Sequence, residues 1–182
     1  MGKVEKVLAK KFKDGGIPKD LFLAILREKK LPISCDIMNY QYRLTATIEY
    51  ESAGLFYHKD WTERVTKIIK LMENITGTPI RLVPDEGNRY DPNATFLIPS
   101  KVLVEKCKEK GYALGFEPLG YVPQKYTKKI IDYMYAGNVV ITIVTGVTPP
   151  DPIGDVYPHI YFKTGIYKQY NKNEKAFAKA PF

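Results

Sequence analysis

One tyrosine-containing segment holds the residue types that could bind a ligand. In it, Arg89 precedes Tyr90 and Asp91. An aromatic ring can stack on a base and a carboxylate can accept a hydrogen bond from a sugar hydroxyl, so this pairing is typical of single-stranded nucleic-acid binding. The alternatives are structural: Asp91 caps the amides of a turn, and Arg89 is a solvated loop cation.

The usual patterns of catalysis and metal binding are missing from the sequence. His58 and His159 lie far apart and have no Cys or acidic partners at ligand spacing, so we expect neither a metal nor a cofactor. The glycine-rich nucleotide loops and the GxSxG elbow are also missing. We therefore expect a binding protein and not an enzyme. A weaker alternative is a metal-dependent nuclease that uses Asp85, Glu86 and Asp91.

Cysteine usage and hydropathy indicate the compartment. The two cysteines, Cys35 and Cys107, form no CxxC pair, and no apolar run follows the basic start of the chain. No stretch reaches the roughly 20 apolar residues of a membrane span. The sequence thus predicts a cytoplasmic protein without a membrane partner.

The net charge of +8 is concentrated at the two ends of the chain. Residues 1–30 carry +5, residues 165–182 carry +3, and residues 31–164 are neutral. Long-range attraction of a polyanion would therefore come from the ends. The alternative is that the chain is lysine-rich without any function for the charge. The aromatic residues and lysines of 165–182 suit a single-stranded nucleic acid, and the alternative for them is a disordered, solubilising tail.

Hydrophobic periodicity predicts a mainly β chain with several helices. A basic helical hairpin is expected in residues 1–40, and a helix with an Asp60–Glu63 capping box after the first strand. Further helices are expected from the Ser100 cap to Lys110 and over 123–135. The expected strands are 42–50, 79–83, 94–98, 119–122, 139–145 and 156–162.

Two motifs carry a family resemblance: RLVPDEGNRYDPNA at 81–94, and LGYVPQ at 119–124 leading into an amphipathic helix. They resemble the strings L-V-R-E-P-D-N-P-Y-D-P-N-A and V-G-Y-V-P-R of the HIRAN family. A weaker third match is AGLFY at 53–57. Together the matches cover roughly residues 42–162.

The resemblance implies an OB-like barrel that binds single-stranded DNA and, in one branch of the family, grips a free 3′ end. Tyr57 and Tyr90 would then be aromatic walls, and Asp91 would accept the terminal hydroxyl. Tyr121 would stand where that branch has a polar ring residue, and Phe56 where it has an arginine. Tyr57 and Tyr121 as ordinary barrel residues with hydroxyls at the rim are the structural alternative.

These observations lead to one prediction of fold and function. We expect an α+β, mainly β fold: a small OB-like barrel (41–164) with packed helices, an N-terminal helical extension (1–40) and a basic aromatic tail (165–182). Residues 99–118 insert a helix that compact family members lack. The expected function is recognition of single-stranded DNA or DNA ends in repair or replication, together with a helicase or nuclease partner. The alternative is an adaptor that docks a DNA-processing protein.

Overall fold

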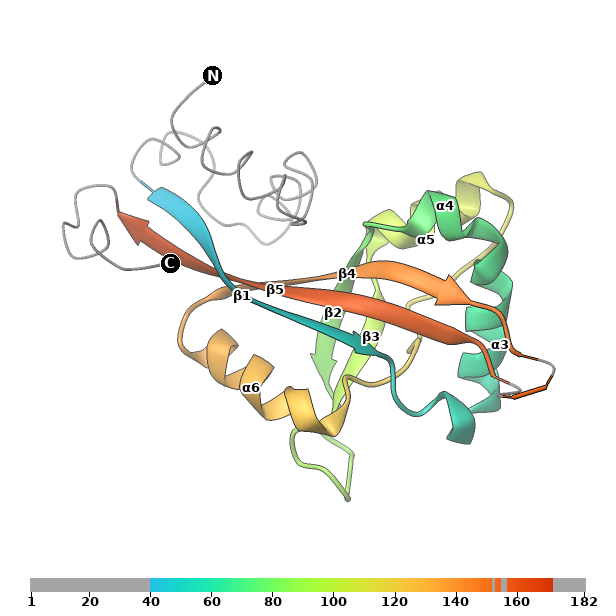
Figure 1. Cartoon of the computed structure of the whole chain (residues 1–182), viewed down its shortest axis with the longest axis horizontal. Helices are drawn as coiled ribbons and strands as arrows, with labels where there is room; N and C mark the ends of the chain where they lie inside the picture. The colour runs from blue at the N-terminus through green and yellow to red at the C-terminus, as the bar shows by residue number, and fades with distance from the viewer. Residues whose placement is uncertain (1–39, 152, 155–156, 172–182) are drawn as a thin grey trace. The chain divides into compact units, whose positions relative to one another are not determined.

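The computed structural model describes residues 40–151, 153–154 and 157–171 (Figure 1). The predicted hairpin of residues 1–40, apart from its last residue, lies outside these ranges, as does the predicted tail after Asn171. The elements in chain order are β1 (Tyr40–Glu51), the 3-10 helix η2 (Leu55–Tyr57), α3 (Lys59–Ile68), η3 (Ile69–Leu71), α4 (Met72–Ile75), β2 (Pro79–Pro84), β3 (Thr95–Pro99), α5 (Lys101–Glu109), α6 (Gln124–Tyr135), β4 (Val139–Thr148) and β5 (His159–Asn171).

The strands form one five-stranded sheet in the order β1-β5-β4-β2-β3. β2 runs antiparallel to both neighbours, with Ile80 opposite Pro99 on β3 and Thr142 on β4. This sheet with its shorter helices confirms the predicted α+β, mainly β class. β1 and β3 are its two edges, so the named strands form an open sheet and not a closed barrel. The OB-like part of the prediction is not confirmed.

A short segment around Tyr121 lies between β3 and the residues after β1. On one side the Leu97 amide donates to the Gly120 carbonyl at 2.9 Å. On the other side the amides and carbonyls of Ala53 and Tyr121 bond each other, at 2.9 and 2.8 Å. The predicted strand at 119–122 is therefore only a pair of isolated bridges. Prolines at both ends explain this, because they have no amide hydrogen with which to extend a ladder.

The start of α3 differs from its prediction. The helix begins at Lys59, and its N-cap residue His58 makes no side-chain cap bond. Asp60 is thus already inside the helix, where it bonds Arg64 one turn on, and the predicted Asp60–Glu63 capping box is wrong. The buried face of α3 is as predicted, since its Trp61, Val65 and Ile68 are all buried.

The cap of α5 is confirmed. The Ser100 hydroxyl accepts a hydrogen bond from the Leu103 amide at 3.2 Å, which satisfies one of the free amides at the start of the helix. Leu103 and Cys107 are fully buried one turn apart, so α5 is fixed by its apolar face. Burial also raises the pKa of the Cys107 thiol.

Three buried hydroxyl groups link β1, β5 and β4 through hydrogen bonds across the core. The Tyr50 hydroxyl and the Thr164 hydroxyl are 2.8 Å apart, and Thr164 is 2.8 Å from the Thr142 hydroxyl. The Tyr50 ring also lies 6.0 Å from that of Tyr126 on α6, which brings α6 against β1. Burial, the largest cause, raises the pKa of Tyr50 to about 12.

The described residues divide into two compact units. One unit consists of Ile48–Asp132 with Ile141–Thr164 and contains every predicted site residue. The other contains Tyr133–Val140 and, of the described residues, 40–47 and 165–171. β5 continues to Asn171, so the first seven residues of the predicted tail are strand. None of the described helices is long and apolar enough to cross a bilayer.

Candidate functional site

The segment after β1 presents two aromatic rings to solvent. Gly54, with a φ of 93°, turns the chain into η2, where Leu55 is buried and anchors the turn. Phe56 is 63 % exposed and Tyr57 is 82 % exposed. Their rings meet edge to face at 5.0 Å, and Tyr157 contacts Phe56 in the same way at 5.0 Å. This exposure excludes a core role for Tyr57.

The β2–β3 loop is held by its own polar side chains. The Asn88 side-chain oxygen accepts from the amides of Tyr90 and Asp91, each at 2.9 Å. Asp91 in turn accepts a hydrogen bond from the Asn93 amide at 2.9 Å. The structural alternative, in which Asp91 caps the turn, is therefore confirmed. The turn leaves Arg89 exposed and Tyr90 96 % exposed at the tip. Whether Asp91 also accepts a ligand hydroxyl stays a prediction.

Tyr121 joins the loop to an aromatic cluster. Its hydroxyl donates to an Asp85 carboxylate oxygen at 2.7 Å. Its ring stacks on Phe96 at 4.9 Å and meets Trp61 edge to face at 5.1 Å, while His58 stacks on Trp61 at 3.7 Å. Burial, and then the hydrogen bond and charge of Asp85, raise the pKa of Tyr121 to about 12. The phenol is therefore a neutral donor that holds the base of the loop.

The predicted residues thus fall into two groups. Tyr121 and Asp91 are half-buried, whereas Phe56 and Tyr57 on η2 and Arg89 and Tyr90 on the β2–β3 loop are exposed. Within the described ranges no ring contact joins Tyr57 to Tyr90.

Sequence reasoning did not find four members of the cluster: Asp85 as the partner of Tyr121, Phe96 as the ring stacked on Tyr121, and the stacked pair His58–Trp61. Asp85 and Tyr121 are 36 residues apart. Nothing in their local sequences indicates the contact.

Both oxygens of the Asp85 carboxylate are already engaged in local bonds. One Asp85 oxygen accepts from the Gly87 amide at 3.2 Å, and the other accepts from Tyr121 and, at 3.4 Å, from Asn88. No group of three His, Cys, Asp or Glu side chains in the described parts of the chain could hold a metal ion. Asp85, Glu86 and Asp91 are accordingly not gathered into the three-ligand site that the nuclease alternative needs.

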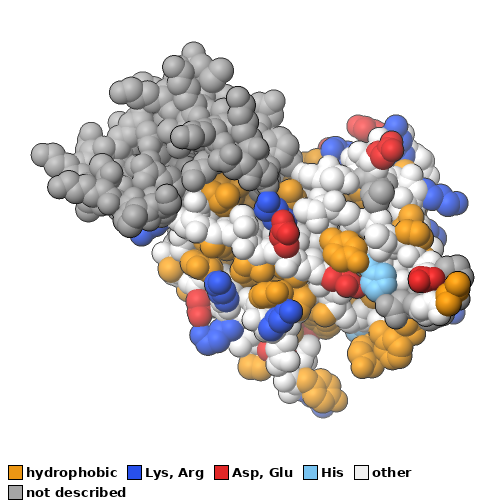
Figure 2. Space-filling view, in the orientation of Figure 1, with side chains coloured by type: hydrophobic (Ala, Val, Ile, Leu, Met, Phe, Trp, Pro, Cys, Tyr) orange, Lys and Arg blue, Asp and Glu red, His pale blue; other side chains and the backbone are white. Residues whose placement is uncertain are grey.

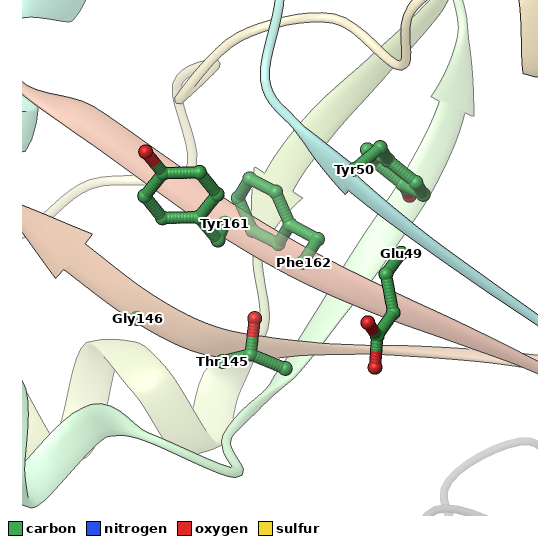
Figure 3. A pocket seen from close by; sticks show the side chains of 6 residues that line it. All are labelled: Glu49, Tyr50, Thr145, Gly146, Tyr161 and Phe162. Carbon is green, nitrogen blue, oxygen red and sulfur yellow. The ribbon is translucent and has the colours of Figure 1, made fainter.

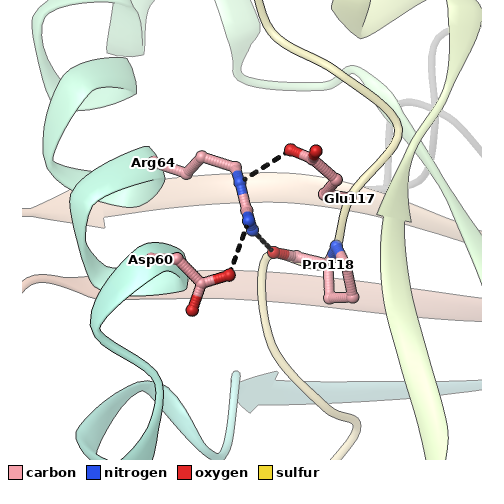
Figure 4. Close-up of polar contacts among 4 residues, drawn as sticks. All are labelled: Asp60, Arg64, Glu117 and Pro118. Carbon is pink, nitrogen blue, oxygen red and sulfur yellow. Dashed lines mark hydrogen bonds and ion pairs between the residues drawn. The ribbon is translucent and has the colours of Figure 1, made fainter.

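An arginine clamp fixes the chain just before Tyr121 (Figure 4). Arg64 on α3 donates to the Pro118 carbonyl at 2.5 Å and pairs with Asp60 at 2.8 Å and Glu117 at 3.2 Å. The Arg64 side chain is only 14 % exposed, so these bonds are partly shielded from water. The clamp ties α3 to the segment that carries Tyr121 and thereby positions the aromatic cluster.

A separate pocket of about 350 Å³ lies where three strands meet (Figure 3). Its lining residues come from β1, β4 and β5: Glu49, Tyr50, Thr145, Gly146, Tyr161 and Phe162. The one carboxylate among them, Glu49, pairs with Lys163 at 3.7 Å. Tyr50 and Phe162 are buried core residues, so the side-chain polar groups that the pocket offers are those of Glu49, Thr145 and Tyr161.

Comparison with known proteins gives no family. No family model matches the chain, and no curated protein matches it. Among solved structures, the chain is similar to a protein from Lactobacillus plantarum determined by a structural genomics consortium, with 18 % identity and a TM-score of 0.39. That similarity covers 69 % of this chain and 98 % of the other.

Proposed function

We propose that this protein is a nucleic-acid-binding module that recognises single-stranded DNA, with free 3′ ends as its preferred form. The observation that carries the proposal is the exposure of three aromatic rings on ordered segments: Tyr90 at 96 %, Tyr57 at 82 % and Phe56 at 63 %. Rings that stabilise no core and are held on short turns are suited to stack on unpaired bases. Binding is the whole of the proposed chemistry, and no catalytic step is included.

The rigidity of the two segments supports this role. Asn88 and Asp91 fix the β2–β3 loop through three side-chain-to-amide bonds, and the Tyr121–Asp85 bond fixes its base. A loop that is ordered before binding loses less conformational entropy when a ligand arrives. Tyr90 is therefore presented in a defined position.

An OB-like architecture is also part of the proposal. OB folds are five-stranded, partly open barrels, and the described sheet has five strands with two free edges. The bridges that Tyr121 makes to Ala53 and to Phe96 connect the end of β1 to β3. These bridges support a ring of backbone bonding that is closed at one end only.

The expected 3′ preference comes from Asp91. Only one of its carboxylate oxygens is engaged by the Asn93 amide, and a carboxylate has room for further donors. A terminal hydroxyl can donate to it, whereas a terminal phosphate would be repelled. Phe56, at the position of the arginine in the 3′-end-binding branch of the HIRAN family, supplies a ring but no phosphate contact.

Fluorescence anisotropy with the full chain tests the proposal. Three labelled probes are compared at low salt: a single strand with a 3′ hydroxyl, the same strand with a 3′ phosphate, and a blunt duplex. We expect the 3′-hydroxyl strand to bind best, and we expect Asp91→Asn to abolish its advantage over the 3′-phosphate strand. If no probe binds at low salt, the nucleic-acid proposal is wrong.

One observation favours the second candidate, a protein-interaction adaptor. A second group of contacting rings consists of Phe56, Tyr57 and Tyr157. Groups of aromatic side chains are common at the centres of protein interfaces. A partner such as a helicase or nuclease would bury these rings. In that case Tyr57→Ala would weaken binding to the partner, while no DNA probe would bind.

A further inference from the structure

Three lysines lie among the exposed residues of α6. α6 has 12 residues, and it buries Thr127 and Ile130 against the core. Because the direction of these two side chains fixes the rotation of the helix, Lys125, Lys128 and Lys129 all point to solvent. Lys125 and Lys129 are one turn apart, about 6 Å along the helix axis.

Little acidic charge compensates this face. Asp132 is the one acid on α6, and it pairs with Lys128 at 2.7 Å. The Lys125 ammonium lies 4.8 Å from the centre of the Tyr126 ring, and no ion pair is described for Lys125 or Lys129 within the described ranges. α6 therefore presents three cations, of which Lys128 has an acidic partner and Lys125 lies beside an aromatic ring. Residues 31–164 as a whole are nevertheless neutral.

The lysine face begins next to the β2–β3 loop. α6 starts three residues after Tyr121, whose hydroxyl bonds Asp85 at the base of that loop. Figure 2 shows Lys and Arg side chains gathered over α6, with the β2–β3 loop projecting beyond one end of the helix (compare Figure 1). A strand whose last base stacks at Tyr90 would thus meet the lysines of α6 as it continues.

We propose that the α6 face formed by Lys125, Lys128 and Lys129 binds the phosphodiester backbone of the single strand whose terminal nucleotide lies at the β2–β3 loop. The inference rests on the proposed function and extends the site from the β2–β3 loop along the three lysines of α6, a surface that we call the lysine track. Charge complementarity selects this occupant, because the backbone of a single strand is a regular row of anions and the lysines are a row of cations.

The test separates the track from the loop by strand length. Full-length protein is titrated with 3′-hydroxyl single strands of about 4 and about 16 nucleotides, the range covered by one OB-type fold. Lys125→Glu/Lys129→Glu should weaken binding of the longer strand roughly tenfold at low salt and change binding of the shorter strand far less. The slope of log K against log [salt] should become shallower by about 1.4, since each phosphate contact on a single strand contributes about 0.7.

The matched control is Lys101→Glu/Lys108→Glu on α5, which makes the same change in net charge on exposed positions away from α6 (Figure 1). Circular dichroism checks the fold of each variant, and Lys125→Gln/Lys129→Gln repeats the test without reversed charge. The track is refuted if both α6 variants bind the longer strand with wild-type affinity and slope, or if the α5 control loses as much. Failure of the wild type to bind either strand would instead overturn the proposed function itself.

Discussion

Tyr121→Phe is the sharpest test of how the site is held together. The substitution keeps the ring that stacks on Phe96 and meets Trp61, and it removes only the hydroxyl that donates to Asp85 at 2.7 Å. Asp85 keeps weaker bonds from Gly87 at 3.2 Å and from Asn88 at 3.4 Å. The base of the β2–β3 loop should therefore loosen while the aromatic cluster remains packed.

The expected cost follows from the charge and exposure of the bond. Hydrogen bonds to charged groups contribute about 1.5–3 kcal/mol, and the pair formed by Tyr121 and Asp85 is only part-buried, so we expect about 1.5 kcal/mol. Urea denaturation measures this as a lower midpoint with an unchanged m-value. An unchanged midpoint would mean that the bond contributes nothing to stability.

The same bond predicts a pH dependence. The pKa of Tyr121 is raised from 10.0 to about 12, chiefly by burial and then by Asp85, so the unfolded chain ionises at lower pH than the folded one. The stability that comes from this difference in the Tyr121 pKa is fully present below pH 10 and is lost as the pH rises through about 12. Tyr50 has a pKa of about 12 and acts in the same direction. As the pH rises from 10 to about 12, the Tyr121→Phe variant should therefore lose less stability than the wild type. It should still lose some, because Tyr50 remains.

A double-mutant cycle with Asp85→Asn identifies the partner. If the hydroxyl and the carboxylate bond each other, the double variant should lose clearly less stability than the sum of the single variants, because both remove one interaction. Additive losses would refute the Tyr121–Asp85 bond as the link between loop and cluster.

Three further predictions concern the exposed rings, a close backbone approach and the chain ends. Tyr57→Ala and Tyr90→Ala should each cost about 1–3 kcal/mol of single-strand affinity with an unchanged melting midpoint, since their rings are exposed. Gly120→Ala should destabilise by about 3 kcal/mol in urea, because its φ is 145° and a Cβ there would lie 2.7 Å from the Ser52 Cβ; Ser52→Gly should restore only part of this. Deleting residues 1–30 or 172–182 should reduce affinity for all strands alike and flatten its salt dependence; an unchanged slope would make the excess charge compositional.

Alternation of apolar residues predicted most of the sheet, but the last strand is longer than predicted. The expected strand at 156–162 instead runs from His159 to Asn171, past Gly165. Glycine weakens a strand in isolation. Here the Tyr167 ring covers it, since a Cβ on Gly165 would lie 2.8 Å from that ring. Such a contact depends on the folded geometry and cannot be read from composition.

The candidate site was predictable where local turn chemistry decides it. Asn88, Asp91 and Asn93 were predicted as loop residues whose side chains bond their own backbone. The side chains of Asn88 and Asp91 do so, whereas Asn93 takes part through its amide, which donates to Asp91. The link from the loop to the aromatic cluster was not predictable, because Asp85 and Tyr121 are brought together by the bridges between β3, Tyr121 and Ala53. Long-range contacts of this kind leave no periodic pattern in the sequence.

Charge illustrates the same difference between sequence and structure. The neutral total of residues 31–164 led to the expectation that only the chain ends attract a polyanion. A total does not show where charges lie: Arg64 is enclosed by Asp60 and Glu117, whereas among the described residues only Lys128 of the three α6 lysines has an acidic partner. Net charge acts over about a Debye length and affects the rate of encounter, while lysines in contact with phosphates affect how long a complex lasts. If the protein binds a single strand as proposed, the ends of the chain and α6 would contribute to different steps of binding.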